Sequence, residues 1–296
     1  MRRVFTLAIA LTCALTATSL GAADAPFLWE VQGPKARHYL MGSVHMLPAS
    51  AHPLPAALDA AYANTRALVL ESDPDVLSSP EFQNRLLASG ASERGLQREI
   101  GAGLLQRVQR HLRAIGLPAT LCDPLKAWMC GLTLGQLEFQ RAGMDAALGI
   151  DHHYHQLAQQ QAREITWLEA PEQQLAIFAD MSAAMGTQFL QSSMDDLDKP
   201  ELRPDALVRM WRRNDAAALA RVVGQMRTEF PQAYARVLAD RNRAWMAPLL
   251  RHLDSVTPTL MIVGAAHLVG PESLVAALAT RGYRLRSVAD ASAVDP

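Results

Sequence analysis

The stretch that decides the fold runs from Thr259 to Val288, TLMIVGAAHLVGPESLVAALATRGYRLRSV. Its first five residues form a short apolar run rich in β-branched side chains, which is typical of a buried strand, and the small residues before His267 predict a tight loop. Apolar residues then recur at helical spacing until Gly282, and the last residues alternate like another strand. The stretch therefore predicts a β-loop-α-β unit that delivers His267 to the carboxyl end of a strand.

Two earlier stretches end in a similar way. Arg37 to Met41 leads into Gly42-Ser43-Val44-His45, so that two predicted strands each end in Gly-x-x-His. The apolar run Ala67 to Leu70 leads directly into Glu71. Because ligands collect outside the carboxyl ends of strands in open α/β sheets, we expect the two histidines and Glu71 to meet at one sheet edge.

Two neutral imidazoles and one carboxylate form a facial site for a divalent cation, with open positions for water and substrate. Zinc, manganese, iron and cobalt all bind such donors. A cation held in this way lowers the pKa of bound water and polarises a carbonyl, which are the requirements of hydrolysis. The helical His-Glu-x-x-His signature is absent, because no two of the predicted ligands lie within one helix.

The composition predicts one large globular domain. The chain has 296 residues, half of them hydrophobic, with a mean hydropathy of +0.01 and a formal net charge of -1. A sizeable core is therefore available, and no basic surface indicates a nucleic-acid partner.

The amino-terminal residues have the pattern of a secretory signal peptide. Arg2 and Arg3 precede an apolar run to about Leu20, and small residues follow. We predict a signal peptide over residues 1–23, a single domain over residues 24–296, and a periplasmic or secreted protein. The apolar run is short for a membrane span, so we expect no stable membrane anchor after cleavage.

The rest of the chain predicts an α/β fold in which a central mixed sheet is flanked by helices. From about Pro80 to Arg163 the pattern is mainly helical, which indicates a large helical middle section. Ile165 to Leu168 predicts a short strand that ends in Glu169, and the pattern is again helical from Pro171 until Pro258.

The cysteines leave one pairing to consider. Cys122 and Cys130 remain once the signal peptide is removed, in a compartment that permits disulfides. Asp123-Pro124, however, is typical of a helix N-cap followed by proline at the first helical position. Eight positions along a helix span roughly 12 Å, which exceeds the reach of a disulfide. The sequence therefore disfavours a bridge.

Several motifs follow one another along nearly the whole mature chain: Leu40 to His45, Leu68 to Glu71, Gly149-Ile150-Asp151, Trp167-Leu168-Glu169 with Gln173, Arg241-Asn242, and Ile262 to Leu268 with Gly270 and Gly282-Tyr283. In this combination they resemble the TraB/GumN (PrgY, Tiki) family. One departure is Ser43, where the family more often has threonine; the hydroxyl is retained.

The resemblance implies an α/β fold shared with the ChaN and erythromycin-esterase-like proteins. It also implies a metal-dependent peptidase activity, as known for the Tiki proteins, which cleave a secreted peptide signal and prefer manganese or cobalt. The two Gly-x-x-His histidines and the strand-end glutamate of the family correspond to His45, His267 and Glu71. Most bacterial members lack an assigned substrate, so the resemblance implies none here.

Each candidate residue also has a structural interpretation. A single histidine such as His45 or His267 is more often a hydrogen-bonded core residue than a ligand, and Glu71 could be an ion-paired carboxylate. Arg241 could stabilise negative charge on a substrate, or it could pair with an acid beside a helix. Glu169 could join the site or brace the helix that follows it.

The residues around position 150 carry two further alternatives. Asp151 could accept a hydrogen bond that fixes a histidine tautomer, or it could cap the following helix. On that helix His152 and His155 share a face while His153 points elsewhere, so we do not predict a second metal site among these histidines.

We predict an exported metal-dependent hydrolase, a peptidase, with Mn, Co or Zn as its one divalent ion. His45, Glu71 and His267 hold the ion, and Glu71, Arg241 and Glu169 serve catalysis on a peptide or small-molecule substrate. We predict no organic cofactor. The alternatives are a non-catalytic peptide- or signal-binding module of the same fold, and a metal-independent esterase that uses a histidine base.

Overall fold

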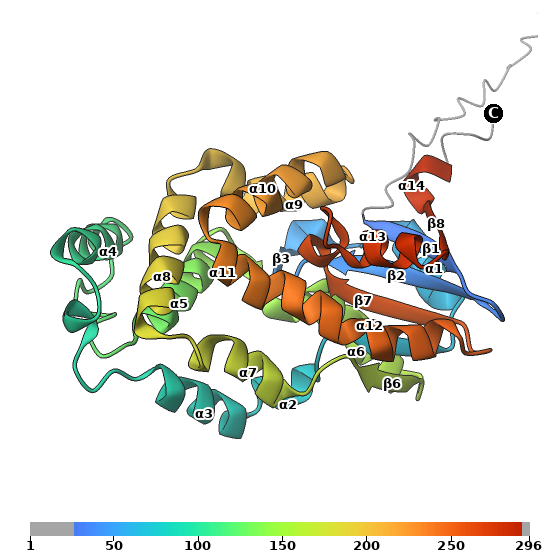
Figure 1. The fold of residues 1–296 in the computed structure, drawn as a ribbon, viewed down its shortest axis with the longest axis horizontal. Coiled ribbons are helices and arrows are strands. Elements are labelled where there is room, and N and C mark those ends of the chain that lie inside the picture. Colours follow the sequence, from blue (N-terminus) through green and yellow to red (C-terminus); the bar gives the residue numbers. More distant parts are fainter. Residues whose placement is uncertain (1–26, 292–296) are drawn as a thin grey trace, which may run out of the picture.

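The computed structural model describes residues 27–291, and its centre is a six-stranded sheet with the order β6-β4-β7-β2-β1-β8 (Figure 1). The neighbours β6, β4, β7 and β2 are parallel, whereas β1 is antiparallel to both β2 and β8. The sheet is therefore mixed, and the predicted α/β class is confirmed. The strands are β1 (Leu28–Gln32), β2 (Arg37–Ser43), β4 (Ala67–Leu70), β6 (Glu164–Trp167), β7 (Thr259–Gly264) and β8 (Arg284–Ser287).

The middle strands β4 and β7 are buried on both faces, which explains why their sequences are unbroken apolar runs. Successive side chains of a strand point to opposite faces of the sheet. Leu260 and Ile262 accordingly belong to one core cluster, and Met261 and Val263 to another.

Helices cover both faces of the sheet (Figure 1). Side chains of α12 and α13 share the core cluster of Met261, and side chains of α1 and α6 share that of Leu260. These helices are α1 (Ala56–Ala63), α6 (Ile150–Gln160), α12 (Asp240–Leu253) and α13 (Leu274–Thr280).

The predicted helical middle section lies beside the sheet, with α4, α5 and α8 at the left of Figure 1. It has buried clusters of its own, in which Leu134 of α5 meets Leu190 of α8. No helix among the described residues is both long enough and apolar enough to cross a lipid bilayer. The remaining helices are α2 (Pro74–Ser78), α3 (Pro80–Gly90), α4 (Ala102–Ala114), α5 (Ala127–Arg141), α7 (Pro171–Ala179), α8 (Ala183–Leu197), α9 (Pro204–Arg212), α10 (Ala216–Glu229), α11 (Pro231–Tyr234) and α14 (Val288–Ala291).

Short elements complete the chain. β3 (Leu47–Pro48) pairs with β5 (Met144–Asp145), and a π-helical turn, Ala235–Ala239, leads into α12. Among residues 27–291, 3₁₀ turns lie at Ala49–Ala51, Leu96–Arg98, Ala146–Leu148, Pro200–Leu202 and Ala265–Leu268. The predicted signal peptide, residues 1–23, lies outside the described residues, and the prediction of a single domain stays a prediction.

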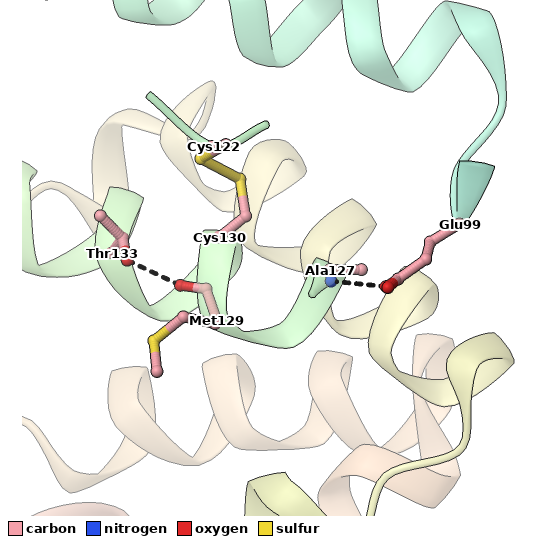
Figure 2. Close-up of a disulfide and its surroundings, with 6 residues drawn as sticks. All are labelled: Glu99, Cys122, Ala127, Met129, Cys130 and Thr133. Carbon is pink, nitrogen blue, oxygen red and sulfur yellow. Dashed lines mark hydrogen bonds between the residues drawn. A yellow bond between two sulfur atoms is a disulfide. The ribbon is translucent and has the colours of Figure 1, made fainter. Parts of the chain in front are cut away.

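The prediction about the cysteines is wrong, because Cys122 and Cys130 form a disulfide (Figure 2). The sequence placed a helix start at Pro124, but α5 begins at Ala127, and Cys122 lies in the turn before it. The chain folds back there, which brings the two Cα atoms to 5.5 Å.

Candidate functional site

The three predicted metal ligands lie at one edge of the sheet. The strands β4, β7 and β2 are parallel neighbours, so their carboxyl ends meet there. Glu71 follows β4 directly, His45 follows β2, and His267 lies in the 3₁₀ turn after β7. Arg241 of α12 lies beside them. We call these four residues, His45, Glu71, Arg241 and His267, the strand-end cluster.

Glu71 is an ionised carboxylate with a partner on each oxygen. The backbone N–H of Gly264 donates to Oε1 at 2.6 Å, and Nη2 of Arg241 donates to Oε2 at 2.5 Å. Burial alone would raise the pKa of Glu71, but the charges of Arg241 and His45 and the Gly264 bond lower it to about 2. The side chain is therefore negative at every pH at which the protein would work.

His267 is buried and neutral. Its Nδ1 lies 2.6 Å from Oδ1 of Asn242, and Nη1 of Arg241 lies 3.1 Å from its Nε2. Because a guanidinium can only donate, Nε2 accepts and Nδ1 carries the proton that is donated to Asn242. Burial lowers the pKa of His267 to about 3, and the ring of Trp245 lies 4.5 Å away. The Nε2 lone pair consequently points toward the guanidinium and Glu71.

His45 lies at a more open position. Its Nδ1 donates to Oδ1 of Asp151 at 3.0 Å, and the carboxylate of Asp151 raises the pKa of His45 to about 9 against the effect of burial. The side chain is nevertheless 59% exposed, so solvent screening weakens this shift. Gly149 is the N-cap of α6, which leaves Asp151 in the first turn to hold the His45 ring.

Arg241 links the cluster to Glu169, which lies behind it. Nε and Nη2 of Arg241 donate to the two oxygens of Glu169 at 3.2 and 2.7 Å. Trp245 also donates to Glu169, at 2.9 Å, and the Arg241 guanidinium lies 4.4 Å from the Trp245 ring centre. Glu71 and Glu169 thus share the buried Arg241 guanidinium, and the catalytic role predicted for Glu169 stays a prediction.

Gly264 keeps a small volume open between the predicted ligands. A Cβ atom at this position would lie 3.3 Å from Oε1 of Glu71, 3.4 Å from Nε2 of His45 and 3.6 Å from Cδ2 of His267. The surrounding donors are of the kinds that bind zinc or manganese in proteins. The kinds of donor in this cluster therefore suit a divalent cation.

The contact between Arg241 and His267 sets a condition on that fit. The described part of the chain does not bring the donor atoms of His45, Glu71 and His267 within 4.8 Å of one another. The lone pair on Nε2 of His267 also accepts a hydrogen bond from Arg241. A cation can bind Nε2 of His267 only if the Arg241 guanidinium moves away from that nitrogen.

Two cavities open onto the cluster, and His45 and Glu71 line both. One, of about 570 Å³, has mainly apolar walls. The other, of about 530 Å³, lies toward α2 and α6, and its lining contains more polar side chains, among them Ser72, Asp151 and Gln174. The apolar walls of the first cavity include Leu132, Phe139, Phe189, Leu207, Met210 and Leu219.

A different group of side chains does bring its donor atoms within 4.8 Å of one another. Asp73, Asp75 and His155, which we call the Asp–His group, could hold a metal ion. Asp73 is the N-cap of α2, Asp75 lies in its first turn, and His155 is on α6. From the sequence, His155 was weighed only with the neighbouring histidines, whereas the structure combines it with two distant aspartates.

Asn242 and Trp245 were given no role from the sequence. Asn242 belongs to one of the quoted motifs, and its Nδ2 donates to the carbonyl of Glu272 at 2.8 Å, which turns its Oδ1 toward His267. Arg241 and Trp245 are four residues apart and so share one face of a helix. That spacing is the sequence signal that could have identified the tryptophan.

Comparison with known proteins covers nearly all of the described chain. Residues 27–287 match the model of the TraB/PrgY/gumN family. Two relatives, each called uncharacterized protein YbaP, come from Escherichia coli (strain K12) and Shigella flexneri. Each is 27% identical over 261 residues, which cover 81% of this chain and 88% of the relative. No solved structure matches the chain, so the likeness to ChaN and erythromycin-esterase-like proteins stays a prediction.

Proposed function

The chain belongs to the TraB/PrgY/gumN family, and from that premise we propose that it is an exported metal-dependent hydrolase that cleaves peptides. His45, Glu71 and His267 hold one divalent ion, Mn, Co or Zn. The observation that carries the proposal is that Oε1 of Glu71, Nε2 of His45 and the ring of His267 all lie around one point beside Gly264. Export and a periplasmic or secreted location rest on the amino-terminal sequence pattern alone.

The reaction we propose joins the oxygen of a water molecule to the carbonyl carbon, breaks the C–N bond and leaves a proton on the departing amine. A bound cation would supply a more acidic water and a polarised carbonyl. Asn242 holds the Nδ1 proton of the neutral His267, which leaves its Nε2 free of a proton, and Asp151 holds Nδ1 of His45, whose Nε2 becomes free when the ring gives up one proton. Arg241 positions Glu71 through their ion pair.

The apolar cavity supports a substrate class. A cavity of about 570 Å³ is large enough for one bulky side chain and adjacent backbone, and specificity in such cavities comes from a few polar groups at one end. Here those polar groups are the strand-end cluster. We propose that the cleaved peptides carry a large apolar residue, such as leucine or phenylalanine, next to the scissile bond.

Removing and returning the metal tests this function. The mature chain, purified without an affinity metal column, is treated with a chelator and given Mn²⁺, Co²⁺ or Zn²⁺ singly, and products of a peptide library are followed by mass spectrometry. We expect cleavage next to large apolar residues only after an ion is returned. Cleavage that survives chelation would overturn the metal-dependent mechanism.

A matched pair of variants sharpens the test. Glu71→Gln should lower metal-restored cleavage at least about 100-fold, because changes to the partners of metal ligands alone cost 10–100-fold. Glu172→Gln removes a carboxylate that is 60% exposed and should leave cleavage unchanged. Equal activities for the two variants would contradict the role of Glu71.

A second candidate is a metal-independent esterase, favoured by the hydrogen bond between Arg241 and His267. In that case His45, after losing the proton that Asp151 stabilises, would act as a base on water. Hydrolysis of a small ester or lactone that persists in chelator but is lost in His45→Gln would favour it. Peptides that bind without being cleaved, with or without metal, would favour a non-catalytic binding module.

A further inference from the structure

A buried imidazole nitrogen outside the strand-end cluster lacks a hydrogen-bond partner. His155 is 2% exposed, and its Nδ1 is buried without such a partner among the described residues. Oδ1 of Asp75 lies 3.8 Å from this nitrogen, which is too far for a hydrogen bond. Buried polar atoms are nearly always satisfied by protein, water or an ion, and no described side chain satisfies this one, which leaves room for water or an ion as its partner.

The two aspartates are held in place by one oxygen each. Oδ1 of Asp73 accepts from the backbone N–H groups of Asp75 and Val76 at 2.9 and 3.4 Å, which caps α2. Oδ2 of Asp75 accepts from Nε2 of Gln159 at 2.7 Å, and its Oδ1 lies on the side of His155. The carboxylates are therefore oriented by bonds that leave an oxygen of each for a further partner.

We propose that the Asp–His group is a second divalent-cation site, which binds Zn²⁺ or a similar first-row transition ion. One imidazole and two carboxylates suit such ions, whereas Ca²⁺ and Mg²⁺ prefer oxygen ligands alone. The side chain of Asp75 is 61% exposed, so water completes the coordination. Nδ1 of His155 gains in the ion the partner that the protein does not supply.

The site would connect segments that also carry the strand-end cluster. Asp73 lies two residues after Glu71, and His155 lies one helical turn after Asp151, the partner of His45. The helices α2 and α6 are in contact. An ion at the Asp–His group fixes α6 to the segment after β4, and so holds Asp151 and Glu71 in their places without touching the substrate.

Counting bound ions by native mass spectrometry tests the proposal. The mature chain is stripped with a chelator, returned to Zn²⁺ and weighed intact. We expect two zinc ions on the wild-type chain, one on Asp75→Asn, one on His267→Ala and none on the double variant. Asp205→Asn is the matched control, because it removes an exposed carboxylate from the first turn of α9, and it should keep both ions.

The outcomes separate this proposal from the proposed function. An Asp75→Asn chain that binds as many ions as the wild type overturns the second site. A wild-type chain that binds a single ion, lost in Asp75→Asn but kept in His267→Ala, supports the second site and removes the metal from the strand-end cluster. The variant His155→Gln gives an independent check when the chain is loaded with Co²⁺ and its visible absorption is recorded. It should lose the same ion as Asp75→Asn.

Discussion

The strand-end cluster and the Asp–His group are neighbours, because Glu71 of the first and Asp73 of the second are two residues apart after β4. The two groups differ in how their polar atoms are paired. In the strand-end cluster both oxygens of Glu71 and both ring nitrogens of His267 have partners. In the Asp–His group Nδ1 of His155 has none among the described residues. In the first group a cation must compete with Arg241 for Nε2 of His267, whereas in the second a cation would supply the partner that Nδ1 of His155 lacks.

The largest expected effect comes from removing the charge at the centre of the first group. Arg241→Met leaves Glu71 and Glu169 buried without a counter-charge, and breaking a buried pair in this way costs about 3–5 kcal/mol of unfolding free energy. Urea denaturation measures it. Arg243→Met, on the same helix with a side chain that is 65% exposed, should stay within about 0.5 kcal/mol of the wild type. Similar losses in both variants would show that the buried network adds no special stability.

Acid should weaken the fold through His267. Its pKa is about 3 in the folded chain, against 6.5 for an ordinary histidine, so between these values the unfolded chain binds a proton that the folded chain refuses. The contribution of His267 to stability is therefore full above pH 6.5 and falls as the pH drops toward 3. Urea denaturation at pH 7, 6 and 5 should show this decline, and a smaller one in His267→Gln. An identical decline in both chains would contradict the assignment.

Asn242 accepts the Nδ1 proton of His267 and so fixes that ring. Removing the Asn242 side chain should therefore affect the site more than the fold. Asn242→Ala should reduce metal affinity and metal-restored cleavage by about 10–100-fold, the usual cost of losing the partner of a ligand. Metal titration and peptide kinetics measure the two effects. Asn84→Ala, an exposed position on α3, should change neither. Reduced cleavage with unchanged metal affinity would mean that Asn242 does not act through His267.

The smallest expected effect tests the space beside Gly264. Gly264→Ala introduces no backbone strain, because its φ of -52° suits any residue, but the new methyl group presses on Glu71 and His45. Metal affinity should fall about tenfold, or roughly 1.4 kcal/mol. The control Gly224→Ala has no atoms near its Cβ on α10 and should stabilise the helix by up to about 1 kcal/mol with no effect on metal. Unchanged affinity in Gly264→Ala would place the ion elsewhere.

The strand ends could be predicted from the sequence because their signals are local. A parallel strand buried on both faces is an unbroken apolar run, and the residue that follows it is carried to the sheet edge. Glu71 and His267 were found in this way, and Oε1 of Glu71 lies 3.9 Å from Nε2 of His267. The family was also predictable, because its motifs follow one another in order over nearly the whole chain.

The partners of these residues could not be predicted, because they depend on how distant elements pack. Glu169 and Arg241 are 72 residues apart, and only the packing of α12 on the sheet selects one as the partner of the other. The Asp–His group likewise requires α2 and α6 to meet. The disulfide was wrongly disfavoured for a local reason: Asp123-Pro124 has the pattern of a helix start, but α5 begins at Ala127.

The most direct measurement is anomalous diffraction from crystals of the mature chain grown with Mn²⁺. We predict a manganese peak bounded by Nε2 of His45, a carboxylate oxygen of Glu71 and Nε2 of His267, with the Arg241 guanidinium moved away from His267. A structure with no peak at this place, in which Arg241 still donates to Nε2 of His267, would contradict the proposal that the strand-end cluster is a metal centre.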